Sequence, residues 1–245
     1  MNDPHALIAE LTELEPIKTW SLIVTLLGDL EVSNISGKDL GVLLSVVGLK
    51  PEATRVALHR LKKGGWITSI KQGREVSYGL SDVGLSETRA AYDDVYRADL
   101  KYPDGWRVVV VNDDECPKNA LRIFRNVWLV PRPKSPQIKA PLWLDLGQDT
   151  LPDWFHEKLV SSDTQELCRQ LSRCAREACD AQLTATQAAA IRLLCLHRWR
   201  KIALREATWA ALWLAPESPL AQCHRDISKL FNTLPCLHPQ QFHAD

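Results

Sequence analysis

The most constraining feature of this sequence is the segment 51–63, whose side chains separate onto two opposite faces if it is a helix. Thr54, Ala57, Leu58 and Leu61 recur at spacings of three and four residues and form an apolar stripe. The opposite face carries a mostly charged set: Glu52, Arg55, Val56, His59, Arg60 and Lys63. A helix that buries one side and exposes Arg, His, Arg and Lys on the other has the chemistry that insertion into the DNA major groove requires.

Two helices are predicted before this segment. The first begins at Pro16 and presents an apolar set to a core: Trp20, Ile23, Leu26, Leu27 and Leu30. After a polar turn at 33–37, Ser36 and Asp39 indicate the cap of a second helix, which Gly48 is placed to end. Its apolar residues fall on one face: Leu40, Leu43, Leu44 and Val47. Pro51 can then open the third helix, so the pattern predicts helix, tight turn, helix.

A β-hairpin is predicted directly after the third helix. Gly64 and Gly65 end that helix, and residues 66–70 and 76–80 alternate in the manner of strands around the turn 71–74. The turn carries Lys71 and Arg74, which such a wing can lay along the phosphate backbone. A further helix is expected from Leu80-Ser81 through Tyr96. Together these elements predict a winged helix-turn-helix.

Positive charge is concentrated in this region although the whole chain is neutral. The chain has 30 basic and 30 acidic residues, whereas residues 50–75 hold seven basic residues and two acids, a local charge of +5. A solvated helix face explains most charge runs, but a winged helix would place the basic helix 51–63 and the basic hairpin turn 71–74 side by side. We therefore interpret the region as a DNA contact surface, with Arg55, His59 and Arg60 as candidates for base contacts. The full set is Lys50, Arg55, His59, Arg60, Lys62, Lys63, Lys71 and Arg74.

The rest of the chain predicts a small mixed segment followed by helices. A turn signal at 102–105 marks the first domain boundary. Strands are expected at 106–111, 127–130 and 142–146, and a helix is expected at 117–125. Beyond Leu151, helices are expected at 165–181, 186–205 and 220–234. The fold class is therefore α+β and multidomain.

Absent signals disfavour several classes of protein. The acidic N-terminal stretch is wrong for a secretory signal, and no run approaches the roughly 18 apolar residues of a membrane span, so we expect a soluble cytoplasmic protein. The seven cysteines include no Cys-x-x-Cys pair, and those at 168, 174 and 179 fit a helical pattern as small buried hydrophobes. The common catalytic signatures are missing, so we expect no enzyme, cofactor or metal.

Two short clusters could in principle hold a metal. Residues 112–114 (Asn-Asp-Asp) follow a predicted strand and give the only support for an enzyme built on the middle of the chain, although Asn and Asp also favour turns. Cys236, His238 and His243 offer soft and imidazole ligands in a terminal tail without a fourth partner, which is a poor metal cage.

Several motifs resemble the PaaX-like family, repressors of phenylacetate catabolism and related regulators. They are LLGDL at 26–30, RVALHRL at 55–61 followed by Gly65-Trp66, then Gly73-Arg74 and Tyr78-x-Leu80-Ser81. A weaker match to the family lies at 193–205. The resemblance implies a winged helix at 1–103, a central ferredoxin-like dimerisation domain at 104–162 and a helical C-terminal domain at 163–245. The central part is short for a full ferredoxin-like unit, and 214–219 lacks the Trp-Pro-Gly ending associated with the family.

The resemblance also implies a function. It indicates a DNA-binding transcriptional regulator, a repressor of a catabolic operon that an aryl- or acyl-coenzyme A thioester releases. We expect a homodimer on a partly palindromic double-stranded operator. Candidate residues for an acidic or coenzyme A ligand are His197, Trp199, Arg200 and Arg205, because guanidinium groups pair with phosphates and carboxylates. The alternative is that these residues form the polar edge of an amphipathic helix.

A rival function from another class is a winged-helix module that docks an acidic protein without specific DNA binding. The exposed side of the third helix separates the two hypotheses. A protein-docking face would be expected to carry apolar side chains where this sequence has Arg55, His59 and Arg60.

Overall fold

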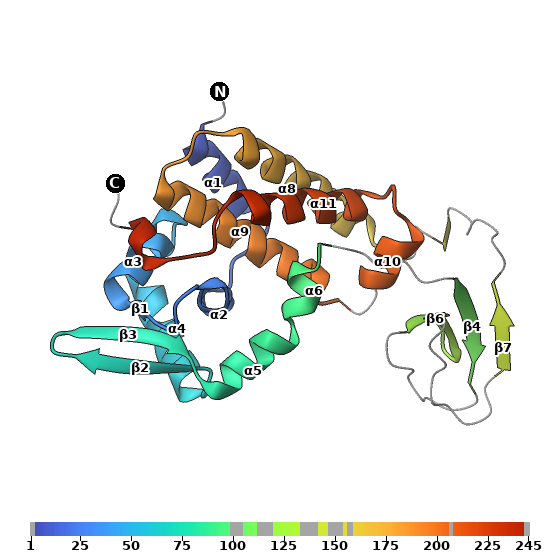
Figure 1. Cartoon of the computed structure of the whole chain (residues 1–245), viewed down its shortest axis with the longest axis horizontal. Coiled ribbons are helices and arrows are strands. Elements are labelled where there is room, and N and C mark those ends of the chain that lie inside the picture. The colour runs from blue at the N-terminus through green and yellow to red at the C-terminus, as the bar shows by residue number, and fades with distance from the viewer. Residues whose placement is uncertain are drawn as a thin grey trace.

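The computed structural model describes residues 3–98, 105–111, 120–132, 142–146, 154–155, 159–205 and 208–242. These residues form a mixed structure of helices and two small antiparallel sheets (Figure 1). The first part of the chain folds into α1 (Pro4–Glu13), α2 (Thr19–Asp29), β1 (Ile35–Ser36), α3 (Gly37–Val46), α4 (Pro51–Lys63), β2 (Ile67–Gln72), β3 (Glu75–Leu80), α5 (Asp82–Ala90) and α6 (Tyr92–Tyr96).

Local chemistry explains where the helices of this part begin and end. Ser36 Oγ accepts a hydrogen bond from the Asp39 N–H at 3.0 Å and so caps α3, as predicted. Gly48 has φ +80° after α3, a conformation that glycine adopts without steric cost, and Pro51 is the first residue of α4. The helix, turn, helix arrangement predicted for residues 36–63 is therefore confirmed.

Two details of the predicted helices were wrong. The helix expected from Pro16 begins at Thr19, and its Trp20 is 48% exposed, because that side of the first turn faces away from the core. The helix expected from Leu80 through Tyr96 is two helices, α5 and α6, which meet at Ala91.

The hairpin that follows α4 is part of a three-stranded sheet in the order β1-β3-β2. Ile67 lies opposite Leu80, and Gln72 opposite Glu75, so the pairing runs to the turn. Gly73 takes φ +61° in that turn. The hairpin predicted from alternation is confirmed, within two residues at each end of its strands.

The second sheet lies beyond α10 in Figure 1 and has the order β5-β6-β4-β7, with all neighbours antiparallel. Its strands are β4 (Trp106–Val110), β5 (Leu121–Phe124), β6 (Val127–Pro131) and β7 (Leu142–Asp145). The expected strands at 106–111, 127–130 and 142–146 are confirmed. The cluster 112–114 lies outside the described residues.

The helix expected at 117–125 was wrong over the part that the structure describes. Leu121 pairs with Leu129 and Arg122 with Trp128, which makes 121–124 an edge strand. Leu121 and Leu129 are both buried against Phe155. Pairing with β6 therefore decides the conformation of a segment whose own sequence pattern is ambiguous.

The last part of the chain is helical, as predicted. It contains α8 (Ser162–Asp180), α9 (Ala185–Ala203), α10 (Thr208–Leu214), α11 (Pro219–Thr233) and a 3₁₀ helix at Pro239–Phe242. Cys168 and Cys174 are fully buried and Cys179 partly, as expected for small hydrophobes. Burial raises the pKa of Cys174 to about 12, which keeps it a neutral thiol.

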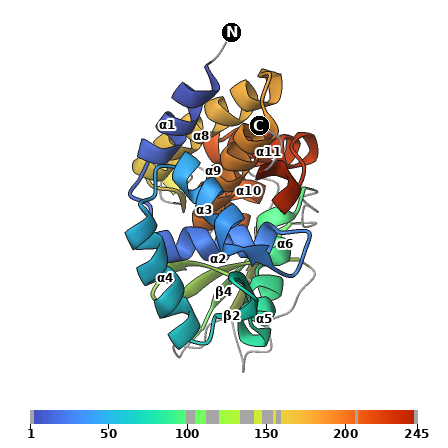
Figure 2. The same cartoon turned by 90° about the vertical axis from the view of Figure 1, so that its left-hand side faces the viewer.

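Helix α9 is the centre of one hydrophobic core that reaches from Leu7 to Phe242. It packs against α1, α2 and α3 from the first part of the chain and against α8 and α11 from the last part (Figures 1 and 2). After α2, the Glu31 N–H donates to the Leu237 carbonyl at 3.0 Å, so the segment that follows α2 also pairs with the segment that follows α11 through the backbone. The N-terminal and C-terminal helices thus share a core.

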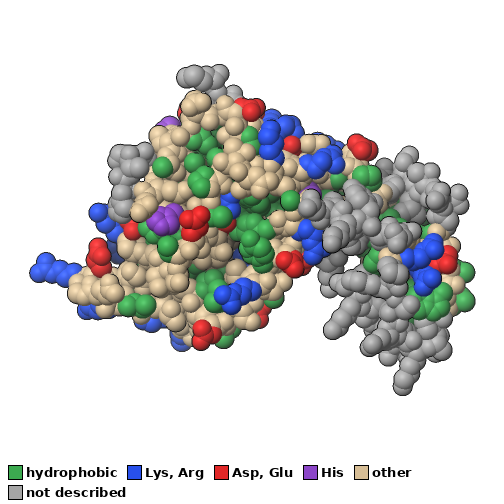
Figure 3. All heavy atoms as spheres, viewed as in Figure 1, with side chains coloured by type: hydrophobic (Ala, Val, Ile, Leu, Met, Phe, Trp, Pro, Cys, Tyr) green, Lys and Arg blue, Asp and Glu red, His purple; other side chains and the backbone are tan. Residues whose placement is uncertain are grey.

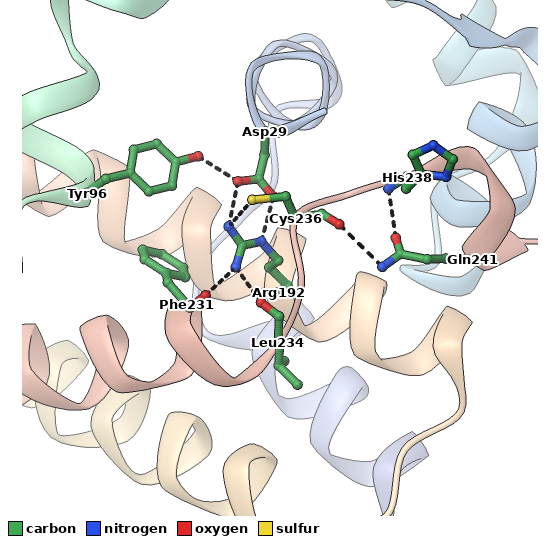
Figure 4. A network of polar contacts seen from close by, with 8 residues as sticks. All are labelled: Asp29, Tyr96, Arg192, Phe231, Leu234, Cys236, His238 and Gln241. Carbon is green, nitrogen blue, oxygen red and sulfur yellow. Dashed lines mark hydrogen bonds and ion pairs between the residues drawn. The ribbon is translucent and has the colours of Figure 1, made fainter. Parts of the chain in front are cut away.

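Two buried arginines of α9 hold the N-terminal helices in place. Arg192 forms a two-bond ion pair with Asp29 at 2.6 and 2.8 Å and donates to the carbonyls of Phe231 and Leu234 (Figure 4). The Tyr96 hydroxyl donates to the same Asp29 carboxylate at 2.8 Å. Each charge is therefore paired and hydrogen-bonded, which is the condition for burying it.

Arg198 does the same for the end of α1. Its Nη2 donates to the carbonyls of Leu11, Thr12 and Glu15 at 3.0, 2.8 and 2.6 Å. Leu11 and Thr12 lie in the last turn of α1, where carbonyls have no partner within the helix, and Glu15 follows it, so the guanidinium supplies these hydrogen bonds. The sequence pattern gives no sign of either role, because their helix is apolar around most of its circumference and shows no distinct polar face.

Candidate nucleic-acid interface

The α4 helix places its two faces as its sequence requires. Thr54, Ala57, Leu58 and Leu61 are buried, at 4 to 8% exposure. The opposite side is exposed along its length and carries Glu52, Arg55, Val56, His59, Arg60, Lys62 and Lys63. The apolar stripe therefore fixes how the helix is rotated about its axis and sends the basic side chains outward.

Hydrogen bonds fix the hairpin against the end of α4. The Lys62 Nζ donates to Ser69 Oγ on β2 at 2.6 Å, and the Trp66 N–H donates to the Leu61 carbonyl at 3.0 Å. Ser81 closes the base of the hairpin from the other strand, because its N–H donates to the Trp66 carbonyl at 3.0 Å. The turn of the hairpin consequently keeps a fixed position relative to α4.

The basic residues of α4 and of the hairpin turn lie at the same end of the molecule. Figures 1 and 2 show α4 and β2–β3 together, away from α8 and α11, and Lys or Arg side chains project from the hairpin tip in Figure 3. We call this set the basic surface; it comprises Lys50, Arg55, His59, Arg60, Lys62, Lys63, Lys71 and Arg74, all of them exposed.

The cations of the basic surface are available for an outside partner. Within the described residues, the ion pairs lie elsewhere, as in Arg107–Asp145, Arg173–Glu10, Arg176–Asp226 and Arg192–Asp29. Lys62 is the exception, since its hydrogen bond to Ser69 holds it against the hairpin. The remaining Lys and Arg side chains give an uncompensated positive field, the kind that attracts a polyanion.

The four residues considered for an effector are not brought together. His197 and Arg200 meet at Thr25, with His197 Nδ1 at 3.2 Å and Arg200 Nη1 at 3.4 Å from its Oγ1. Trp199 is buried and its Nε1 donates to the Val95 carbonyl at 2.9 Å. Arg205 is exposed and donates to Thr164 Oγ1 at 2.6 Å. Most of this set therefore serves packing between helices.

The buried state of His197 determines its charge. Thr25 Oγ1 donates its hydrogen to the Ser21 carbonyl at 2.9 Å, so its oxygen accepts a hydrogen bond from the N–H of His197 Nδ1. Burial, together with the charges of Lys201, Arg198 and Arg200, lowers the pKa of His197 to about 3. The imidazole is therefore neutral at physiological pH.

Two adjoining hollows lie where α2 meets α6, α9 and α11. The first is mainly apolar and is lined by residues that include Val24, Thr25, Tyr96 and Arg200. The second has a volume of about 350 Å³ and adjoins the Asp29–Arg192 pair and Tyr96. Among the four effector candidates, Arg200 alone lines either of these two hollows.

The described residues contain neither a metal-binding cluster nor a membrane-spanning helix. Among the described residues, no group of three or more His, Cys, Asp or Glu side chains is arranged to hold a metal ion. His243 lies outside the described residues, and Cys236 instead accepts a hydrogen bond from Arg192 at 3.3 Å. No described helix has the length and apolar character needed to cross a membrane.

Comparison with known proteins defines the class of the N-terminal region. Residues 18–84 match the family model of the PaaX-like proteins. The transcriptional repressor PaaX of Escherichia coli K12 is 36% identical over 102 residues, which cover 40% of this chain and 32% of the relative. The resemblance inferred from the motifs is confirmed for residues 18–84, which are similar to the PaaX-like proteins. The aligned part spans about a third of the relative's length.

One solved structure can be compared over most of the chain. An uncharacterized protein of Mycobacterium tuberculosis is 16% identical, with a TM-score of 0.47, and the comparison covers 91% of this chain and 95% of the other.

Proposed function

We propose that α3, α4 and the β2–β3 hairpin form a winged helix-turn-helix that binds double-stranded DNA and that the protein is a transcriptional repressor. The observation that carries the proposal is the basic surface: α4 buries its apolar stripe and exposes Arg55, His59 and Arg60 beside a hairpin whose turn carries Lys71 and Arg74. The match of this segment to the PaaX-like family supports it.

The proposal gives the exposed side chains two roles. Arg55, His59 and Arg60 enter the major groove with α4 and contact base edges or adjacent phosphates. The hairpin follows the phosphate backbone, which it positions without reading sequence. The residues that supply mainly charge are Lys50, Lys62, Lys63, Lys71 and Arg74.

A homodimer would present two such helices to two half-sites one helical turn, or a multiple of it, apart. The segment 104–162, which contains the second sheet, is the proposed dimerisation domain, between the winged helix at 1–103 and the helical part at 163–245. The repressor would act in the cytoplasm, where its operator DNA lies. This assignment rests on the family resemblance and on the two-fold symmetry that dimeric repressors share with their operators.

An acyl-coenzyme A thioester is the proposed effector that releases the repressor. The hollows between α2, α6, α9 and α11 support a site there, because a ligand in them would touch both α2, which packs on α4, and the C-terminal helices. Arg200 is the candidate residue on the wall. His197, Trp199 and Arg205 are hydrogen-bonded to Thr25, Val95 and Thr164, respectively. They would therefore act only by holding the helices together.

The test is binding of the purified protein to a fluorescent duplex from its own upstream region and to random DNA across a salt series. We expect selective binding that falls roughly a thousandfold between about 50 and 200 mM salt if about six phosphates are neutralised per dimer. Weak, unselective binding would overturn the proposal in favour of the protein-docking module.

A further inference from the structure

The exposed face of α4 carries one large apolar side chain, Val56, among its charged ones. Val56 is 52% exposed and lies one helical turn from both Glu52 and Arg60 and next to Arg55. It makes no contribution to the core, which the opposite stripe of α4 supplies. On the basis of the proposed DNA-binding function, we propose that Val56 reads the 5-methyl group of a thymine in the major groove.

The chemistry of the base edges favours thymine over the other bases. In the major groove thymine presents a methyl group beside its O4 acceptor, whereas adenine, guanine and cytosine present only hydrogen-bonding groups there. Val56 has no polar atom with which to satisfy such groups. Pressed against an adenine or cytosine amino group, it would leave a donor without a partner. Contact with a methyl group has no such cost.

The position and stiffness of Val56 suit this role. It lies in the second turn of α4, in the N-terminal half of the helix that approaches the base edges in helix-turn-helix complexes. A valine in a helix holds one side-chain rotamer and has a short reach. Its base must therefore lie directly beneath the helix, while the longer Arg55 and Arg60 reach the positions on either side.

The experiment begins with the duplex that the wild-type protein selects, in which each thymine is replaced in turn by deoxyuracil, which lacks the methyl group. We expect one replacement, or one symmetry-related pair, to weaken wild-type binding about fourfold per half-site, the scale of one buried methyl. Val56→Ala should bind the thymine duplex more weakly by a similar factor and should no longer distinguish thymine from uracil. Because alanine is the better helix former, this variant should fold at least as stably.

Val83→Ala is the matched control, since Val83 is 61% exposed on α5, outside the basic surface. It should keep the wild-type penalty for uracil. Selective binding with no sensitivity to any uracil, or an equal penalty in Val56→Ala, would overturn the role of Val56 and leave the DNA-binding function standing. Loss of all selectivity in the wild type would instead overturn the function itself.

Discussion

Arginine side chains have two opposite roles in this protein. Arg192 and Arg198 are buried at 2 and 0% exposure and have their hydrogen bonds supplied by a carboxylate and by carbonyl groups. Arg55 and Arg60 are exposed, with no carboxylate partner among the described residues. Arg192 and Arg198 stabilise the fold, whereas Arg55 and Arg60 are available to bind another molecule.

Replacing Arg55 by alanine should reduce operator affinity by about 1 to 3 kcal/mol and relax specificity at one base pair, if Arg55 contacts a base. The measurement is titration of the variant with operators changed at single positions. Arg169→Ala is the control, because Arg169 is an exposed arginine of α8 that forms an ion pair with Glu166 and lies outside the basic surface. Uniform weakening on all sequences would assign Arg55 to phosphate instead.

The buried Asp29–Arg192 pair should be costly to break from either side. Asp29→Asn and Arg192→Met should each lower the free energy of unfolding by about 3 to 5 kcal/mol, because each leaves a charge buried without its partner. The double variant should lose much less than the sum. Urea unfolding of the four proteins measures the coupling, and additive losses would show that the two groups do not interact.

His197 makes stability depend on pH. Its pKa is about 3 in the folded protein, against an ordinary value near 6.5, so the unfolded chain binds the proton more readily. Stability is therefore complete above about pH 6.5 and falls as the pH drops toward 3, by at most about 1.4 kcal/mol per pH unit. Burial also lowers the pKa of His224, which adds a loss of the same sign.

His197→Gln should flatten this dependence, since glutamine does not titrate. The measurement is the free energy of unfolding in urea at pH 7.5, 6.5 and 5.5 for both proteins. His5→Gln, at an exposed position of α1, is the control and should leave the wild-type slope unchanged. An unchanged slope in His197→Gln would show that another group carries the dependence.

At the scale of elements, the N-terminal region could be predicted closely because its signals are local. Ser36, Gly48, Pro51 and Gly73 each fix the backbone within a few residues of themselves. The orientation of α4 also followed from its own spacing. The exposed face that makes up the candidate site was therefore available from the sequence alone.

The elements that could not be predicted depend on partners outside their own segment. β5 is a strand because β6 pairs with it, and α9 has no apolar face to detect because helices pack around it. Of the effector candidates, His197 and Trp199 were considered as ligand contacts or as part of a helix edge, yet both are buried, with hydrogen bonds to Thr25 and Val95. These two hydrogen bonds join residues more than a hundred positions apart, beyond the reach of local patterns.

The hairpin should contribute charge rather than sequence recognition. Lys71→Ala and Arg74→Ala should weaken binding to operator and random DNA alike, and each should lower the salt slope by about one, because one phosphate fewer is neutralised. The measurement is affinity against salt on both duplexes. Lys229→Ala, at an exposed position of α11 outside the basic surface, is the control. A change in specificity would place the hairpin in a groove.

At the scale of the whole molecule, one core joins the proposed DNA-binding region to the C-terminal helices. The apolar sides of α1 and α2 face α9, and Asp29 depends on Arg192 for its partner. Residues 1–98 produced alone should therefore unfold less cooperatively and at lower urea than the full chain. Far-ultraviolet circular dichroism of both proteins across a urea series measures this, and equal stability of the fragment would show that it folds independently.

The most direct test of the central claim is selection of duplexes from a random library by the wild-type protein, followed by sequencing. We predict enrichment of two related half-sites one helical turn, or a multiple of it, apart, and loss of one preferred base in each half-site when Arg55 is replaced by alanine. A pool that stays random while the protein remains folded would contradict the account, because the exposed face of α4 would then have no sequence to read.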